Sequence, residues 1–524
     1  MVAKYLGLDL STQSLSVIVA DERLDIVWKD SIKFDSELKE FNTQNGVHRH
    51  IDGETVTSPV LMWVKALDII LMKLAESELS LKEIEMITGS AQQHGSVFWK
   101  KSSEITLANL NVHETLVDQL QECFEPLEVP VWMDCSTAKQ CSQLEDAVGG
   151  SIQLAKLTGS RAFKRFTGNQ IAKMYQTNED VYLNCERICL VSNFLASLFL
   201  GRYAPIDYSD GSGMNLLNIA SKKWDDCLLN ACAPGLAMRL GEPVSSSTVI
   251  GNISMYLVKR FGFSPTCRLV AFTGDNPSSL AGLNLTSGDI ACSLGTSDTL
   301  LLWTHKAEPN IEGSVFVNPL QDEEFMTMLC FKNGSLSRQI ICDQHCGGSW
   351  STFNEMLRKT KPGNNHKIGL YFHELEILPE ALGVYRWNDI DELVNFFTSE
   401  EEVRAVLEGQ FLIRRYYAEK YGFAIGPTTR IIATGGASNN TSILQVLSDV
   451  FGVPVYRIKE ESNSACLGCI YRCARVKKVH VISNHVLVCS PTVADETYQI
   501  VLSRYSRLLK TVLKYSEKSS NGSK

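Results

Sequence analysis

Two acidic residues stand where their carboxylates could take part in a reaction. Asp9 follows the apolar run 5–8 and precedes a turn of hydroxyl-bearing residues at 11–14. Asp275 follows a short apolar run and precedes Pro277, which suits the first turn of a helix. A carboxylate can accept the proton of an attacking alcohol, and a carboxylate beside a hydroxyl-rich turn can hold Mg²⁺ through water. These residues suggest proton transfer and metal-assisted phosphate chemistry.

Two interpretations of Asp275 stay open on local grounds. At the start of a helix the positive end of the dipole favours an ionised carboxylate at neutral pH, which a proton acceptor requires. The alternative is an ordinary helix N-cap, and for an isolated Asp-Asn-Pro it is the more frequent role.

Three small-residue segments could bind phosphate oxygens. The turn 11–14 contains Thr12, and a second turn begins with Gly295 and Thr296; small residues in such turns let backbone N–H groups approach a phosphate. The segment 434–440 places paired glycines before a helix N-terminus, which allows close approach to a nucleotide. It is neither a Walker loop nor G-x-G-x-x-G. Each segment could also be a plain turn or a tightly packed helix start.

A run of polar residues follows the strand predicted at 84–87. Gln92, Gln93 and His94 offer two amides and an imidazole, which suit a polyhydroxylated ligand. The alternative is a surface turn. Arg165 could reach a sugar hydroxyl or a carboxylate of the protein, and its spacing does not decide between them.

The elements that would position these residues indicate an α/β fold, because strands alternate with helical stretches. Two hairpins are predicted: one with strands at 5–8 and 15–19, another with strands at 289–294 and 298–303. Their similar turns indicate a duplicated domain.

Helical periodicity predicts a helix over 441–451. Asn440 can cap its start, and Gly452 with Pro454 closes its end. The apolar stretch 190–200 contains serine and asparagine and is too short to span a bilayer, so it predicts a buried helix.

A chain of 524 residues is too long for one ordinary core, so two large domains are expected. We place the first at 1–283 and the second at 284–515. The polar residues 516–524 are expected to form a disordered tail.

The composition limits the kinds of partner and the cellular compartment that are expected. The net charge of −9 gives no reason to expect nucleic acid or an anionic membrane as a partner. The N-terminal residues lack the features of a signal peptide, and sixteen cysteines are scattered along the chain. A cytoplasmic protein with reduced thiols is therefore expected. The pairs Cys466/Cys469 and Cys342/Cys346 have metal-like or redox-like spacing, with structural packing as the favoured interpretation.

Taken in order along the chain, these segments resemble the FGGY carbohydrate kinases, most closely the xylulose kinases of eukaryotic type. The resemblance covers almost everything except the polar tail. The matching segments are 9–14, 91–95, 131–134, 165–170, 273–277, 293–297 and 435–438. Three residues depart from the family pattern: Ser11 and Ala91 replace glycines, and Ser16 stands where a basic residue is common.

The resemblance implies two ribonuclease-H-like domains of the actin and hexokinase type, with an active-site cleft between them. It implies that Asp275 is the catalytic base and that His94, Arg165 and Asn276 hold a ketose together with it. Asp9 matches the acidic residue associated with Mg²⁺. The residues that would contact ATP are Thr12, Gly295 and Thr296 in the hydroxyl turns and Trp350, Gly436, Ala437 and Asn440 around the adenosine.

The implied activity is ATP-dependent phosphorylation of D-xylulose to D-xylulose 5-phosphate, which feeds the pentose phosphate pathway. The implied partners are the sugar and MgATP, with the chain acting as a monomer or homodimer. One alternative is a kinase of the same fold for ribulose, gluconate or glycerol. Another is a non-catalytic sugar or nucleotide sensor, or a chaperone-like ATPase; the presence of Asp9 and Asp275 argues against a sensor, and the chain has no spare length for a peptide-binding domain.

Overall fold

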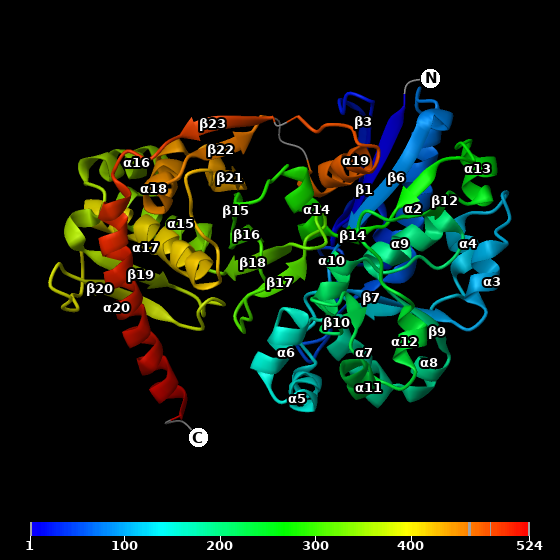
Figure 1. Ribbon diagram of the computed structural model, residues 1–524, viewed down its shortest axis with the longest axis horizontal. Helices are drawn as coiled ribbons and strands as arrows, with labels where there is room; N and C mark the ends of the chain where they lie inside the picture. The colour runs from blue at the N-terminus through cyan, green and yellow to red at the C-terminus, as the bar shows by residue number, and fades with distance from the viewer. Residues whose placement is uncertain (1–2, 460–462, 483, 522–524) are drawn as a thin grey trace. The chain divides into compact units, whose positions relative to one another are not determined.

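The computed structural model describes residues 3–459, 463–482 and 484–521. The chain divides into two compact units (Figure 1). Unit 1 comprises 1–284, 309–325 and 462–482, and unit 2 comprises 285–308, 326–461 and 483–524. The predicted boundary lies one residue from the end of the first stretch of unit 1. The segments 309–325 and 462–482 were expected in the second domain, however, and they pack into unit 1.

Unit 1 contains a twisted sheet whose strand order is β12-β13-β6-β1-β2-β3, with β14 also paired to β6. Its strands are β1 Lys4–Leu10, β2 Ser14–Ala20, β3 Ile26–Lys33, β6 Ile84–Ala91, β12 Val249–Asn252, β13 Arg268–Val270 and β14 Thr273–Gly274. The first three strands are antiparallel neighbours, β6 is parallel to β1 and β13, and β12 is antiparallel at the edge. Parallel pairing of β1 with β6 brings the C-terminal ends of both strands to one edge of the sheet.

Short strands and helices surround this sheet. The other strands of unit 1 are β4 His48–Arg49, β5 Val56–Pro59, β7 Ser96–Lys100, β8 Glu128–Pro130, β9 Cys185–Leu190, β10 Leu217–Asn218, β11 Lys223–Trp224 and β17 Ser314–Val317. The helices are α1 Phe34–Glu37, α2 Val60–Ala75, α3 Ser103–Ala108, α4 Leu116–Leu120, α5 Ala138–Ala147, α6 Ser151–Thr158, α7 Thr167–Thr177, α8 Glu179–Leu183, α9 Val191–Leu200, α10 Tyr208–Gly211, α11 Asp226–Cys232, α12 Leu236–Leu240, α13 Met255–Phe261, α14 Asp275–Gly282 and α19 Ser464–Val476.

Unit 2 repeats the arrangement with the strand order β18-β16-β15-β21-β22-β23. Here β15 and β16 form the antiparallel hairpin, β15, β21 and β22 run parallel, and β23 is antiparallel at the edge. The strands of unit 2 are β15 Ile290–Leu294, β16 Asp298–Thr304, β18 Phe325–Phe331, β19 Ile368–Phe372, β20 Gly383–Trp387, β21 Ile431–Thr434, β22 Val455–Ile458 and β23 His485–Cys489. Both hairpins lie where the sequence predicts them, and their equivalent settings agree with a duplicated domain.

Five longer helices complete unit 2: α15 Ser335–Cys346, α16 Trp350–Lys359, α17 Ser399–Lys420, α18 Thr441–Phe451 and α20 Asp495–Asn521. The predicted helix over 441–451 is confirmed with both of its ends. The expectation of a disordered tail is corrected as far as Asn521, because the backbone of α20 is helical up to that residue. Residues 522–524 lie outside the described part of the chain.

The helix α19 comes from late in the chain but packs in unit 1 against β1, β6 and α14 (Figure 1). Its contact with α14 is very close, because a Cβ on Gly468 would lie 1.8 Å from the carbonyl oxygen of Ser278. The buried thiols of Cys466 and Cys469 reach backbone carbonyls of β2 and β1, Ser16 at 3.5 Å and Leu8 at 3.2 Å. Packing therefore accounts for this cysteine pair, as favoured from the sequence.

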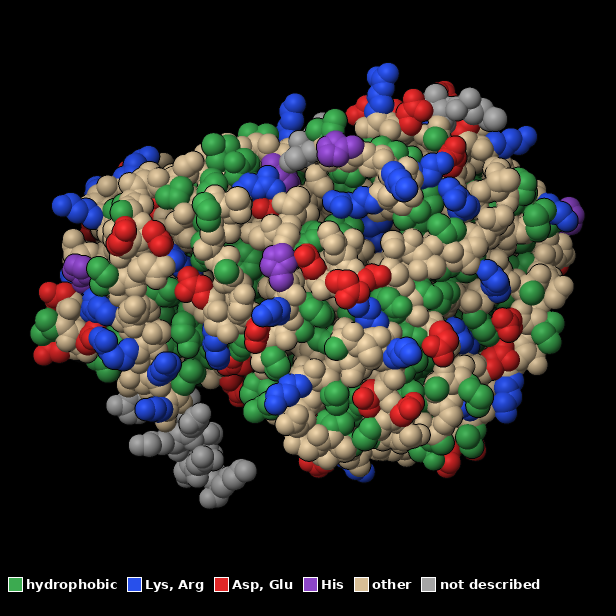
Figure 2. Space-filling view, viewed as in Figure 1, with side chains coloured by type: hydrophobic (Ala, Val, Ile, Leu, Met, Phe, Trp, Pro, Cys, Tyr) green, Lys and Arg blue, Asp and Glu red, His purple; other side chains and the backbone are tan. Residues whose placement is uncertain are grey.

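The predicted buried helix at 190–200 is confirmed by α9, in which every residue is buried. In the described part of the chain, no helix is both long enough and apolar enough to cross a membrane. On the face shown in Figure 2, basic and acidic side chains are interspersed.

Candidate active site

Asp9 lies near the end of β1 with its side chain buried. Oδ1 accepts a hydrogen bond from Ser90 Oγ of β6 at 2.8 Å, and Oδ2 accepts one from Asn463 Nδ2 at 3.1 Å and another from the Ser11 hydroxyl. Burial raises the pKa of the Asp9 carboxyl, and these three donors oppose that rise. Ser11, which replaces a glycine of the family pattern, thus adds a donor to this carboxylate.

Asp275 is the first residue of α14, and the N-cap position belongs to Gly274. The N-cap interpretation of Asp275 is therefore wrong. Its Oδ1 accepts hydrogen bonds from the backbone N–H of Asn276 at 2.8 Å and from Asn276 Nδ2 at 3.1 Å.

Desolvation, with a smaller contribution from the charge of Asp9, raises the pKa of Asp275 to about 7. The sequence predicted that the helix dipole keeps this carboxylate ionised at neutral pH, and the raised pKa corrects this prediction. The first turn of a helix favours the anion by only a modest amount, whereas loss of water acts on the whole charge. Asp275 is thus poised near the pH at which a general base works best.

A chain of hydrogen bonds continues from Asp275 into the interior of unit 1. Asn276 Nδ2 donates to Gln93 Oε1 at 3.1 Å, and Gln93 Nε2 donates to Asp210 Oδ1 at 3.3 Å. Burial and the neighbouring Asp207 raise the pKa of Asp210 well above its usual value. Sequence reasoning missed both of these acids; their three-residue spacing in a hydroxyl-rich stretch was the available signal.

His94 is buried at the turn after β6 and has φ of +70°. Its ring stacks on Phe166 with centroids 4.3 Å apart, and Nδ1 lies 2.9 Å from the carbonyl oxygen of Gly213. A carbonyl only accepts, so Nδ1 carries the hydrogen and Nε2 is left as an acceptor. Burial, with a smaller effect of Arg165, lowers the pKa of His94 to about 3, so the ring is neutral at physiological pH.

Arg165 lies in the same part of unit 1. Its guanidinium is 5.0 Å from the ring centroid of Phe163 and 5.7 Å from that of Phe166. The His94 ring stacks on this same Phe166 ring. Arg165 lines a cavity of about 780 Å³. Trp132, which also lines this cavity, donates from Nε1 to Thr12 Oγ1 at 2.9 Å, so the first hydroxyl turn lies next to Trp132.

Unit 2 has a cavity of about 630 Å³ that gathers all six residues predicted there for nucleotide binding. They come from the β15–β16 turn, the first residue of α16 and the segment before α18. The six are Gly295, Thr296, Trp350, Gly436, Ala437 and Asn440. Thr12, the seventh predicted nucleotide residue, belongs to unit 1.

Gly435 and Gly436 have different structural roles at this cavity. Gly435 has φ of +80°, and a Cβ there would lie 2.7 Å from the carbonyl oxygen of Leu294. Gly436 faces open space, with no heavy atom within 4 Å of an added Cβ. Asn440 caps α18 by accepting from the N–H groups of Ser442 at 3.0 Å and Ile443 at 3.3 Å. The backbone is thus held in place by Gly435 and open to a ligand at Gly436.

Arg338, which lines this cavity, belongs to a buried ion cluster that sequence reasoning missed. Arg338 donates to both oxygens of Asp298, at 2.9 and 3.0 Å, and Arg414 donates to Asp298 Oδ2 at 2.6 Å. Arg338 Nη1 also donates to Gln410 Oε1 at 2.9 Å. Asp298 opens β16, so the cluster fixes the turn that carries Gly295.

Among the residues that the structure describes, no group of three or more His, Cys, Asp or Glu side chains forms a ready-made metal site. This holds for the weak candidate at Cys342 and Cys346, whose side chains are buried; His345 beside them lies 3.2 Å from Ser399 Oγ.

Unit 1 thus contains a carboxyl group with a pKa near 7 and a neutral imidazole, and unit 2 contains a cavity whose backbone is open at Gly436. The fold is that of solved sugar kinases: a xylulose kinase from Rhodospirillum rubrum superposes with a TM-score of 0.80 at 14% identity, covering 98% of this chain and 99% of that one. This likeness shows the fold, which is a pair of α/β units each built on a mixed sheet.

Residues 103–282 match the N-terminal domain, and residues 290–476 the C-terminal domain, of the FGGY family of carbohydrate kinases. The chain is 50% identical to a xylulose kinase of Rattus norvegicus over 97% of both chains. It is 45% identical to xylulose kinase 2 of Arabidopsis thaliana, over 90% of this chain and 86% of that protein. The chain belongs to the FGGY family of carbohydrate kinases, and it is a kinase.

Proposed function

We propose that the protein phosphorylates D-xylulose with ATP and releases D-xylulose 5-phosphate. The observation that carries the proposal is the acceptor pair of Asp275, whose pKa is about 7, and neutral His94 in unit 1. The named relatives support xylulose as the sugar.

In this proposal, Asp275 accepts the proton of the terminal hydroxyl as that oxygen attacks the γ-phosphate in line. His94 accepts a hydrogen bond from a sugar hydroxyl at Nε2, because its Nδ1 hydrogen is used by Gly213. Arg165 and Asn276 supply N–H donors to sugar oxygens.

ATP is proposed to bind the unit 2 cavity with its adenosine against Trp350 and Gly436 and its phosphates toward Gly295 and Thr296. Mg²⁺ keeps several waters and takes few protein carboxylates when it binds with nucleotide phosphates. Asp9, a buried carboxylate among hydroxyl groups, fits that need and would hold the ion. The bound ion would offset phosphate charge.

We place the enzyme in the cytoplasm, as a monomer or homodimer. All sixteen cysteines are free, which suits a reducing compartment. Light scattering of the purified chain distinguishes the two oligomeric states.

The substrate is tested with a panel of sugars in a coupled assay of ATP consumption. D-Xylulose is expected to give the highest kcat/KM, ahead of D-ribulose, D-gluconate and glycerol. Higher turnover of one of the others would assign the chain to that sugar, and ATP hydrolysis that no sugar stimulates would contradict a sugar kinase altogether.

The pH dependence of kcat/KM is expected to report the pKa of Asp275. Since the ionised carboxylate is the acceptor, kcat/KM should rise about tenfold per pH unit below pH 7 and level off above it. The profile should have its midpoint near 7. A flat profile from pH 5 to 8 would show that a group with an ordinary carboxyl pKa is the base.

Gly436→Leu is expected to raise KM for ATP by about tenfold or more, since roughly 1.4 kcal/mol of lost binding has that effect. The new side chain enters open space in the cavity, so the fold should survive. Gly426→Leu is the matched control, because a Cβ at Gly426 also meets no heavy atom within 4 Å and Gly426 does not line the cavity. Equal ATP kinetics in the two variants would exclude nucleotide binding at Gly436.

A further inference from the structure

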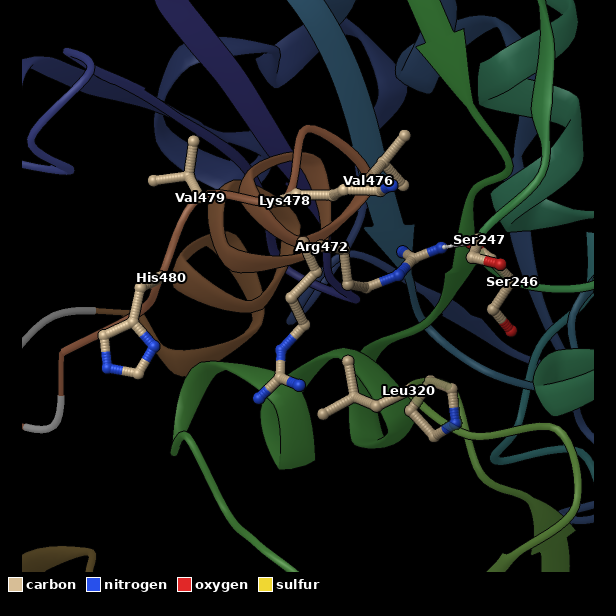
Figure 3. A pocket seen from close by; sticks show the side chains of 10 residues that line it. Ser246, Ser247, Leu320, Arg472, Val476, Lys478, Val479 and His480 are labelled. Atoms are coloured by element: carbon tan, nitrogen blue, oxygen red, sulfur yellow. Dashed lines mark hydrogen bonds between the residues drawn. The ribbon is translucent and has the colours of Figure 1, made fainter.

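Unit 1 contains another cavity, of about 650 Å³, that the proposed reaction does not use. Its walls come from the end of α19 and the turn after it, from the segment before β12 and from the segment after β17 (Figure 3). The lining residues are Ser246, Ser247, Pro319, Leu320, Arg472, Arg475, Val476, Lys478, Val479 and His480. We call it the α19 cavity.

The α19 cavity is basic. Arg472, Arg475, Lys478 and His480 line it, and none of the described residues on its walls is acidic. Their charges contrast with a chain whose net charge is −9. The remaining lining residues are two serines and the apolar residues proline, leucine and valine.

The side chain of Arg472 gives the strongest indication that the α19 cavity binds a ligand. Its side chain is only 2% exposed, and Nη2 donates to the carbonyl oxygens of Ser246, at 2.7 Å, and Ala271. Nε and Nη1 are buried and have no hydrogen-bond partner in the described part of the chain. Leaving buried N–H groups of a cation unsatisfied is costly, so this guanidinium is built to meet an acceptor that the protein does not supply.

The carboxylate of Asp207 does not supply that acceptor. Asp207 interacts with Arg472 through its charge, but its Oδ2 accepts from Thr273 Oγ1 at 2.8 Å and from the Ser246 hydroxyl. Its Oδ1 accepts from the N–H of Asp210 at 3.1 Å. Asp207 therefore balances part of the charge and leaves two N–H groups of Arg472 available.

A helix C-terminus attracts basic residues through its dipole, which explains the exposed Lys477 and Lys478 after α19. It does not explain Arg472, which lies a turn earlier and is buried. Arg475 Nη2 donates to the side-chain oxygen of Asn284 at 3.4 Å and so is held at the cavity wall. Two guanidinium groups and an ammonium on one concave surface are the groups that bind phosphate.

We propose that the α19 cavity is a binding site for the phosphate group of a small anion, either a sugar phosphate or free phosphate. Arg472, Arg475 and Lys478 bind the phosphate oxygens, and the exposed Ser247 faces the hydroxylated remainder. His480 is the only aromatic side chain among the described lining residues, so the walls do not favour a nucleobase. The volume exceeds what phosphate alone fills, which leaves room for a sugar.

The test is calorimetric titration of the full-length protein with inorganic phosphate and, separately, with D-ribose 5-phosphate, using sulfate as a control for ionic strength. Saturable binding of one or both is expected. Tighter binding of the ester identifies a sugar phosphate as the ligand, and equal binding identifies free phosphate. A heat signal that sulfate and both phosphates share without saturation would overturn the proposal.

Substitutions at the cavity wall test whether the phosphate ligand binds in the α19 cavity. Arg475→Ala combined with Lys478→Ala should weaken binding by at least about tenfold, because each removes a charge-assisted contact. Lys477→Ala is the matched control: Lys477 adjoins the cavity in sequence but pairs with Glu85 at 2.7 Å, and its variant should bind as the parent does. Unchanged affinity in the double variant would overturn the proposal.

The active site must be excluded as the place of binding. The parent protein saturated with ATP should bind the phosphate ligand with unchanged affinity. Loss of binding under saturating ATP would place the ligand in the reaction site and overturn the proposal. These titrations need no catalysis, so they stand whichever sugar the enzyme phosphorylates.

Discussion

Replacing Asp275 with asparagine is expected to lower kcat by about 10²- to 10⁴-fold, the range typical for loss of a general base. An amide of the same shape can still accept a hydrogen bond from Asn276, but it cannot take a proton. KM for the sugar should change far less than kcat. Steady-state kinetics with D-xylulose and MgATP measure both values.

The same variant should remain folded, and at pH 8 it should be at least as stable as the parent. The pKa of Asp275 is about 7 in the folded protein against 3.8 for an ordinary aspartate. The protonated form is therefore favoured by folding, and its contribution to stability is lost as pH rises through 7. Asparagine stays neutral, so thermal denaturation should show no loss at pH 8.

Asp226→Asn is the matched control for this experiment. Asp226 is also the first residue of a helix of unit 1, α11, but its side chain is exposed. Its variant should retain parental kcat. Near-normal turnover by folded Asp275→Asn protein would show that Asp275 is not the base.

Replacing Asp298 with alanine is expected to destabilise unit 2 by about 3–5 kcal/mol, the cost of breaking a buried ion pair from one side. Both Arg338 and Arg414 would lose their carboxylate while their side chains remain at most 1% exposed. The measurement is the midpoint of urea denaturation, followed with fluorescence. Since Arg338 and Gly295 line the nucleotide cavity, KM for ATP should rise in the same variant.

Asp343→Ala controls for the loss of an aspartate on a nearby helix. Asp343 lies on α15 with Arg338, but it is exposed, and within the described part of the chain its side chain accepts only from Gln339, at 2.7 Å. Its denaturation midpoint should stay close to that of the parent, within the effect of about 0.5 kcal/mol usual for surface changes. A parental midpoint in Asp298→Ala would mean that the two arginines find other acceptors or water.

Local features of the fold were predictable because their causes are local. The helix α18 has its periodicity, its Asn440 cap and its Gly452 end within one stretch of chain, and all three occur in the structure. Both hairpins follow from alternating apolar runs around short turns. Six of the residues that line the unit 2 cavity were named from the sequence, some from turns of small residues and all from resemblance to a family.

The features that were missed depend on contacts between distant residues. The partners of Asp9 include Asn463, which is 454 positions away, and no local pattern links them. The pKa of Asp275 follows from burial, which the dipole argument did not include. The cluster of Asp298 with Arg338 and Arg414 joins a strand to two helices, and its members look like ordinary surface charges in the sequence.

Because α19 lies late in the sequence, it affects the order in which the two units can fold during synthesis on the ribosome. Unit 1 receives Asn463 and the helix that follows it only after more than four-fifths of the 524 residues have been synthesised. Domains commonly fold as units during synthesis, N-terminal first, but here the first domain must wait while the second emerges. A nascent chain stopped before residue 463 would lack the donor to Asp9 and the helix behind α14. Premature termination late in the coding sequence therefore leaves unit 1 incomplete as well as unit 2.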